Sequence, residues 1–233
     1  MLAAAAVITV LGAILTLLPL VFLRRGGGTG GRGATFVYFA AIGLAYLLLE
    51  ITCLSRMTHL IGDPVWAAAV TIGGFLLFSG AGSLSAQRLD PQQTRLARFL
   101  IGGLVIVAVA ALFGFPFAAA LGGGLPMLLR CALALVLIAP LGYLMGFPMP
   151  IALARLQGSA PALIPWAWAI NGCASVLAPP LAIAMGMTWG FTVAGLSAIA
   201  LYGAVVAVIG GVGAGRGTGH EGRGIAQGEA AAA

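Results

Sequence analysis

The chain has 233 residues; 61% of them are hydrophobic, only 7% are charged, and the formal net charge is +6. A soluble domain carries about 25% charged residues, so this composition excludes an ordinary water-soluble domain and predicts a surface that faces lipid. All eleven basic residues are arginines, and they lie at the ends of apolar runs. That placement is typical of membrane sorting and argues against nucleic acid as a partner.

Apolar runs that could cross a bilayer recur along the chain, because a spanning helix needs about 20 apolar residues. In the first run, residues 2–23, the positive charges follow the apolar stretch and the stretch is too long for a signal peptide, so it predicts a retained membrane helix. Further spans are predicted at residues 36–57, 65–86, 97–121, from 125 onward, 162–185 and 191–209. The expected fold is all-α: one polytopic transmembrane helix bundle of about seven spans over residues 1–211.

Two segments lack an apolar pattern. The stretch GGGTGGRG, residues 26–33, is typical of a flexible connection. Residues 212–233 are rich in glycine and alanine and predict a disordered C-terminal tail.

The span that begins near residue 125 is irregular. Its apolar pattern continues to residue 156, about 32 residues, which is too long for one upright crossing. Pro148 and Pro150 lack amide protons and disfavour helix in the residue before each of them. Together with Gly146 they predict a broken helix, followed by a short interfacial helix that ends at Arg155.

Residues 162–185 are predicted to form a helix interrupted by Pro179 and Pro180. Broken backbone at membrane depth survives only inside a bundle or beside a water-filled cavity, so both irregular segments are expected in the interior. Asn171 lies in this second segment. An asparagine inside a span usually forms a hydrogen bond to a neighbouring helix, and a contact to a substrate is the alternative.

Glu50 lies inside the span 36–57, where a carboxylate is costly and should face other helices. Tyr46 shares its stripe on a helical period. Counting residues at about 1.5 Å each places Arg130 at nearly the same depth as Glu50, which predicts a bidentate ion pair. In the alternative, Arg130 reaches the outer headgroups and Glu50 is protonated.

No pattern for catalysis, cofactor or metal binding occurs in the sequence. It has no G-x-S-x-G elbow, no H-E-x-x-H motif and no Walker lysine. The three cysteines form no C-x-x-C pair, so no zinc or redox site is indicated. The chain is therefore expected to be non-catalytic, with no cofactor.

The arginines also predict an orientation. With the N-terminus outside, nine arginines fall on the inner side, and only Arg56 and Arg130 fall toward the outer side. Cytoplasmic loops carry an excess of positive residues, so this count predicts an outer N-terminus and a cytoplasmic C-terminus. The expected location is the bacterial inner (plasma) membrane, with the lipid bilayer as the first partner.

Four stretches occur in a recognisable order: YFAAIGLAYLLLEITCLSRM (38–57), FSGAGSLSAQRL (78–89), PLGYLMGFPMPIALARL (140–156) and PWAWAINGCASVLAPPLA (165–182). Over about residues 36–190 the chain resembles the C-terminal membrane region of bacterial spermidine synthase-like large integral membrane proteins. The matching motifs are Glu50–Ile51, Gly146-x-Pro148-x-Pro150 and Trp168–Ala169-x-Asn171–Gly172.

The resemblance implies the membrane module of a spermidine synthase-like system. The transferase-like soluble domain of that family is absent from these 233 residues, so the transferase half is expected either as a separate protein or to have been lost, and other membrane subunits are the alternative partners. The module would bind or pass a small cationic or lipid-soluble substrate, with Glu50 selecting charge. Two alternatives stay open: a secondary transporter or channel, and a structural accessory subunit of a membrane complex.

Overall fold

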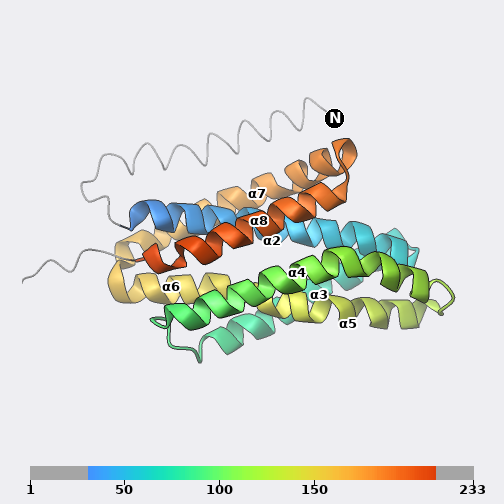
Figure 1. Ribbon diagram of the computed structural model, residues 1–233, viewed down its shortest axis with the longest axis horizontal. Coiled ribbons are helices and arrows are strands. Elements are labelled where there is room, and N and C mark those ends of the chain that lie inside the picture. The colour runs from blue at the N-terminus through green and yellow to red at the C-terminus, as the bar shows by residue number, and fades with distance from the viewer. Residues whose placement is uncertain (1–30, 214–233) are drawn as a thin grey trace, which may run out of the picture.

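The computed structural model describes residues 31–213, and these form a bundle of helices without any strand (Figure 1). Six helical segments in this range are long and apolar enough to cross a membrane. The helices are α2 (Arg32–Ile61), α3 (Pro64–Ala86), α4 (Thr94–Gly122), α5 (Met127–Met145), α6 (Pro148–Ser159), α7 (Ile164–Thr188) and α8 (Phe191–Val208). By length and hydropathy, α5 and α6 together make one of the six segments.

The sequence prediction agrees with these helices within a few residues. Each of the six later spans overlaps one of the six segments. At the glycine-rich stretch 26–33 the prediction of a flexible connection was wrong for the last two residues, because α2 begins at Arg32, and residues 26–30 lie outside the described residues. The span predicted at residues 2–23 and nearly all of the predicted tail lie outside the described residues.

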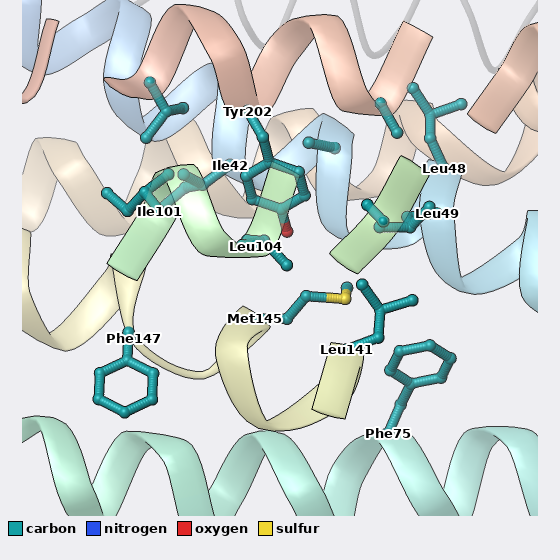
Figure 2. Close-up of a cluster of buried hydrophobic side chains, with 14 of the residues drawn as sticks. Ile42, Leu48, Leu49, Phe75, Ile101, Leu104, Leu141, Met145, Phe147 and Tyr202 are labelled. Atoms are coloured by element: carbon teal, nitrogen blue, oxygen red, sulfur yellow. The ribbon is translucent and has the colours of Figure 1, made fainter. Parts of the chain in front are cut away.

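Helix α2 is the centre of the bundle. In its most apolar 18-residue stretch 61% of the residues are buried, whereas no other spanning segment exceeds 33%. It packs against α7 and α8 on one side and against α3, α4 and α5 on the other (Figure 1). Figure 2 shows the core on the second side, where Phe75 of α3 and Leu141 and Met145 of α5 point toward Leu49 of α2.

Small residues bring some helices into backbone contact. A Cβ atom on Gly82 of α3 would overlap the backbone carbonyl oxygen of Tyr143 in α5, and one on Gly146 would overlap that of Ser79. Glycine and serine at such positions allow helices to approach closely. The α3–α5 contact therefore tolerates no side chain at Gly82 or Gly146.

The perimeter of the bundle is apolar. Large hydrophobic side chains are exposed on α3, α4, α5 and α7, including Leu77, Phe99, Phe117, Leu128 and Met187. In water such a surface would be an aggregation liability, whereas in a bilayer it faces hydrocarbon. The apolar spans and perimeter together indicate a multi-pass membrane protein.

The two ends of the bundle differ in charge. The N-terminus of α2 and the C-terminus of α8 lie at the same end (Figure 1). That end also holds the α3–α4 connection and α6, and the arginines near it are Arg32, Arg88, Arg95, Arg98 and Arg155. Of the arginines within residues 31–213, only Arg56 and Arg130 lie toward the opposite end, where Asp63 caps α3 by accepting hydrogen bonds from the amides of Val65 and Trp66.

Candidate ligand pocket

A pocket of about 580 Å³ lies between α2, α3, the α5–α6 junction, α7 and α8. This volume falls in the range of about 300–1,000 Å³ that is usual for small-molecule sites. Most of the lining surface is apolar, with Ile42 and Leu47 from α2, Leu76 from α3 and Met149 and Leu153 from α6. The pocket therefore favours an apolar ligand.

The α5–α6 junction forms one wall. Helix α5 ends at Met145, and the amides of Gly146 and Phe147 donate to the carbonyls three residues back, at 3.2 and 3.3 Å. The chain then enters α6 at Pro148, whose missing amide proton is harmless at the first position of a helix. Gly146, Pro148 and Pro150 all line the pocket.

Tyr38 holds this junction from α2. Its side chain is fully buried, and its hydroxyl donates a hydrogen bond of 2.8 Å to the backbone carbonyl of Pro148. This role of Tyr38 was not predictable from the sequence, because a tyrosine near the start of an apolar run looks like any interfacial aromatic residue. Its buried bond fixes the position of α6 against α2.

Hydrogen-bonding groups in the pocket come from three helices. The hydroxyls of Tyr46 in α2 and Ser79 in α3 form a hydrogen bond of 3.1 Å. Asn171 of α7 also lines the pocket, and its side-chain amide has no hydrogen-bond partner among residues 31–213. The hydrogen bond to another helix that was predicted for Asn171 is therefore not formed by its amide.

Packing brings Asn171 to this position. A Cβ atom on Gly43 would lie 2.5 Å from the Asn171 backbone oxygen and 3.0 Å from its Oδ1 atom. Ser175, one turn further along α7, donates to the same backbone oxygen at 2.8 Å. The absence of a side chain at Gly43 thus lets α7 bring the amide to the pocket wall.

The predicted pair between Glu50 and Arg130 is wrong. Arg130 donates from Nε to the carbonyl of Leu125 at 2.8 Å and from Nη2 to that of Gly123 at 2.6 Å. Its guanidinium also lies beside Gly62, twelve residues beyond Glu50, which is about 18 Å along α2. Glu50 is 9% exposed, forms no ion pair with a described residue and does not line the pocket.

The reason for this error lies in the start of α5. The helix begins at Met127, so Arg130 is in its first turn, close to the connection from α4. Backbone carbonyls at the end of a helix have no partner within that helix, and they accept hydrogen bonds from a nearby arginine. The arginine therefore binds its own connection, and depth alone did not predict its partner.

The predicted interruption at Pro179 and Pro180 is also wrong. Helix α7 runs without a break from Ile164 to Thr188 with both prolines inside it. Each proline removes one backbone hydrogen bond, but packing against neighbouring helices allows a membrane helix to continue. Neither proline lines the pocket.

Arg155 is a second buried group that the sequence did not predict. It is 4% exposed, and α6 continues past it to Ser159. Its guanidinium donates to the carbonyl of Pro91 at 2.6 Å, to that of Ile209 at 2.7 Å and to the hydroxyl of Thr94 at 3.3 Å. Arg155 thus joins α6 to the α3–α4 connection and to the end of α8.

No protein-family model, curated protein or solved structure matches this chain. Within residues 31–213, no three His, Cys, Asp or Glu side chains lie close enough together to hold a metal ion. The fold and the pocket define the class: a multi-pass membrane protein, helical throughout its described bundle, with a mainly apolar pocket that carries a few neutral polar groups.

Proposed function

We propose that this protein binds a small, neutral, lipid-soluble molecule in the pocket between α2, α3, the α5–α6 junction and α7. The observation that carries the proposal is the lining itself. It contains tyrosine, serine and asparagine side chains among aliphatic ones, but no acidic or basic residue. A charged ligand buried there would lack a counter-charge, which is costly in an apolar environment.

This chemistry favours the lipid-soluble substrate over the cationic one. A polyamine needs carboxylates, and the one carboxylate within the described spans, Glu50, is outside the lining. The amide of Asn171 and the hydroxyls of Tyr46 and Ser79 can instead form hydrogen bonds with a carbonyl or hydroxyl group. The ligand class is therefore an apolar molecule with one or two neutral polar groups.

The binding test is a titration with ubiquinone-1, a neutral lipid-soluble quinone, of the protein reconstituted in nanodiscs. Binding is measured as the quenching of tryptophan fluorescence. Trp168 lines the pocket and serves as the reporter. Asn171→Ala is expected to weaken binding about tenfold, because one hydrogen bond in an apolar site contributes about 1.4 kcal/mol.

The control for this test is Glu50→Gln, which keeps the side-chain shape and lies outside the lining, so it should bind like the parent. Spermidine should not compete. Competition by spermidine together with loss of binding in Glu50→Gln would instead establish a cation site and overturn the proposal.

We also propose the finer topology: seven spans, of which residues 2–23 form the first, with an outer N-terminus and a cytoplasmic C-terminus. Five arginines at one end of the described bundle against two at the other support this orientation. A cysteine introduced at Asp63 should react with an impermeant maleimide added outside intact cells, whereas one introduced at Arg95 should not. The reverse pattern would contradict the orientation.

The family resemblance supports a role as the non-catalytic membrane module of a spermidine synthase-like system, in the inner membrane, with a separate transferase-like protein as partner. Residues of two of its three motifs line the pocket, Gly146-x-Pro148-x-Pro150 and Trp168 with Asn171. Co-purification of such a protein in mild detergent tests this role.

The junction at Gly146 also suits a secondary transporter, since such proteins bind substrates at discontinuous helices. Flux of the ligand into proteoliposomes distinguishes the two.

A further inference from the structure

Among the buried helical hydroxyls of residues 31–213, that of Thr71 is the exception. Serine and threonine hydroxyls inside a helix commonly donate to the carbonyl four residues back. Eight described side chains do so, namely Thr35, Thr52, Thr58, Ser85, Ser159, Ser175, Thr188 and Ser197. Thr71 of α3 is 0% exposed, yet its Oγ1 atom has no hydrogen-bond partner among the described residues.

A carboxyl group without a partner lies at the same depth on the adjoining helix. The rings of Tyr46 and Phe75 lie 6.4 Å apart, which fixes the register of α2 against α3. One helical turn from this pair toward the α2–α3 connection are Glu50 on α2 and Thr71 on α3. Residues four apart share a face of a helix, so both side chains follow the facing stripes that hold Tyr46 and Phe75.

No basic side chain compensates Glu50. Of the ionisable groups on α2, Tyr46 and Cys53 lie close enough to Glu50 to interact electrostatically, and neither is a cation. Helix α3 carries no ionisable residue between Pro64 and Ala86. The ionisable residues of the other helices packed on α2 are Arg95, Arg98, Arg130, Cys131, Tyr143, Arg155, Cys173 and Tyr202, and none forms an ion pair with Glu50.

We propose that Glu50 and Thr71 form a proton-binding site within the bilayer, one helical turn from the ligand pocket. A buried carboxylate without a counter-charge is costly at membrane depth, and one bound proton removes that cost. The acid form also supplies an O–H donor, for which the Thr71 hydroxyl is the acceptor that the described bundle leaves unused. The site binds and releases one proton and needs no other reactant.

Dicyclohexylcarbodiimide, an apolar reagent specific for acid-form carboxyls in membranes, tests the site. The O–H of the acid adds across one C=N bond of the reagent, and the O-acylisourea formed rearranges to an N-acylurea. The protein therefore gains the mass of one reagent molecule. Modification is expected on the peptide that contains Glu50, decreasing as the pH rises, and it should fall to background in Glu50→Gln. An unmodified Glu50 at every pH at which the protein stays folded would overturn the proposal.

The role of Thr71 has its own control. Thr71→Val removes the acceptor of the acid form and should move the midpoint of modification by about one pH unit to lower pH, a tenfold loss of proton affinity. Thr52→Val is the matched control, because Thr52 is similarly buried but donates to the carbonyl of Leu48. An unchanged midpoint or a shift to higher pH would show that Thr71 is not that acceptor. Quinone binding is measured separately, so either result can fail without the other.

Discussion

Replacing Gly82 with alanine is expected to destabilise the bundle by about 3 kcal/mol, the upper part of the range for overpacked cores. The new Cβ atom would overlap the backbone carbonyl oxygen of Tyr143. A flexible side chain could turn away, but here the obstacle is the backbone of α5. Relief therefore requires α3 and α5 to separate along their whole contact, including the point where Gly146 meets Ser79.

The same helix supplies a control for this prediction. A Cβ atom on Gly73 of α3 would meet no other atom within 4 Å, so Gly73→Ala tests the same chemical change without the collision. Alanine favours helix over glycine by about 1 kcal/mol, so Gly73→Ala should retain or raise stability. Thermal unfolding in detergent, followed with a thiol-reactive fluorophore that reaches buried Cys53 only when the bundle opens, measures both. Equal midpoints would contradict the close contact.

The small residues of α3 are compatible with close packing, but they do not identify the partner helix. Ser79, Gly80, Gly82 and Ser83 leave room for another backbone at any point around the helix. In the structure Gly82 and the backbones of Ser79 and Ser83 meet the end of α5, whereas a Cβ atom on Gly80 would meet nothing within 4 Å, and Gly80 lines the pocket. Which small residue packs and which remains open depends on the rotation of each helix, and a weak apolar periodicity does not specify it.

The spans themselves were predictable because bilayer thickness fixes the length of an apolar run. The same reasoning predicted the depth of each residue in the bilayer, but not the direction in which its side chain points around the helix. Glu50 and Arg130 were matched by counting residues, yet Arg130 binds the carbonyls of Gly123 and Leu125. A connection between two helices offers acceptors that a count of residues per span does not include.

The candidate site was predicted in part. Tyr46, Gly146, Pro148, Pro150 and Asn171 all line the pocket, since irregular or polar residues at membrane depth are favourable only in the interior. The charged residues that the sequence made most conspicuous do not line it.

Replacing Arg155 with methionine is expected to destabilise the protein by about 3 kcal/mol. The change would leave the carbonyls of Pro91 and Ile209 without their donor, and an unsatisfied buried polar group costs about 1–3 kcal/mol. Arg155→Lys should recover only part of the loss, because an ammonium group lacks the planar fork that reaches two carbonyls and Thr94 at once. The α3–α4 connection should become sensitive to protease before the rest of the bundle, since Arg155 ties it to α6.

Arg95→Met is the matched control: Arg95 is exposed at the same end of the bundle, so its loss should leave both thermal stability and proteolysis near the parent values. If Arg155→Met behaved like Arg95→Met, the three hydrogen bonds would not be what holds α6 to the α3–α4 connection and α8.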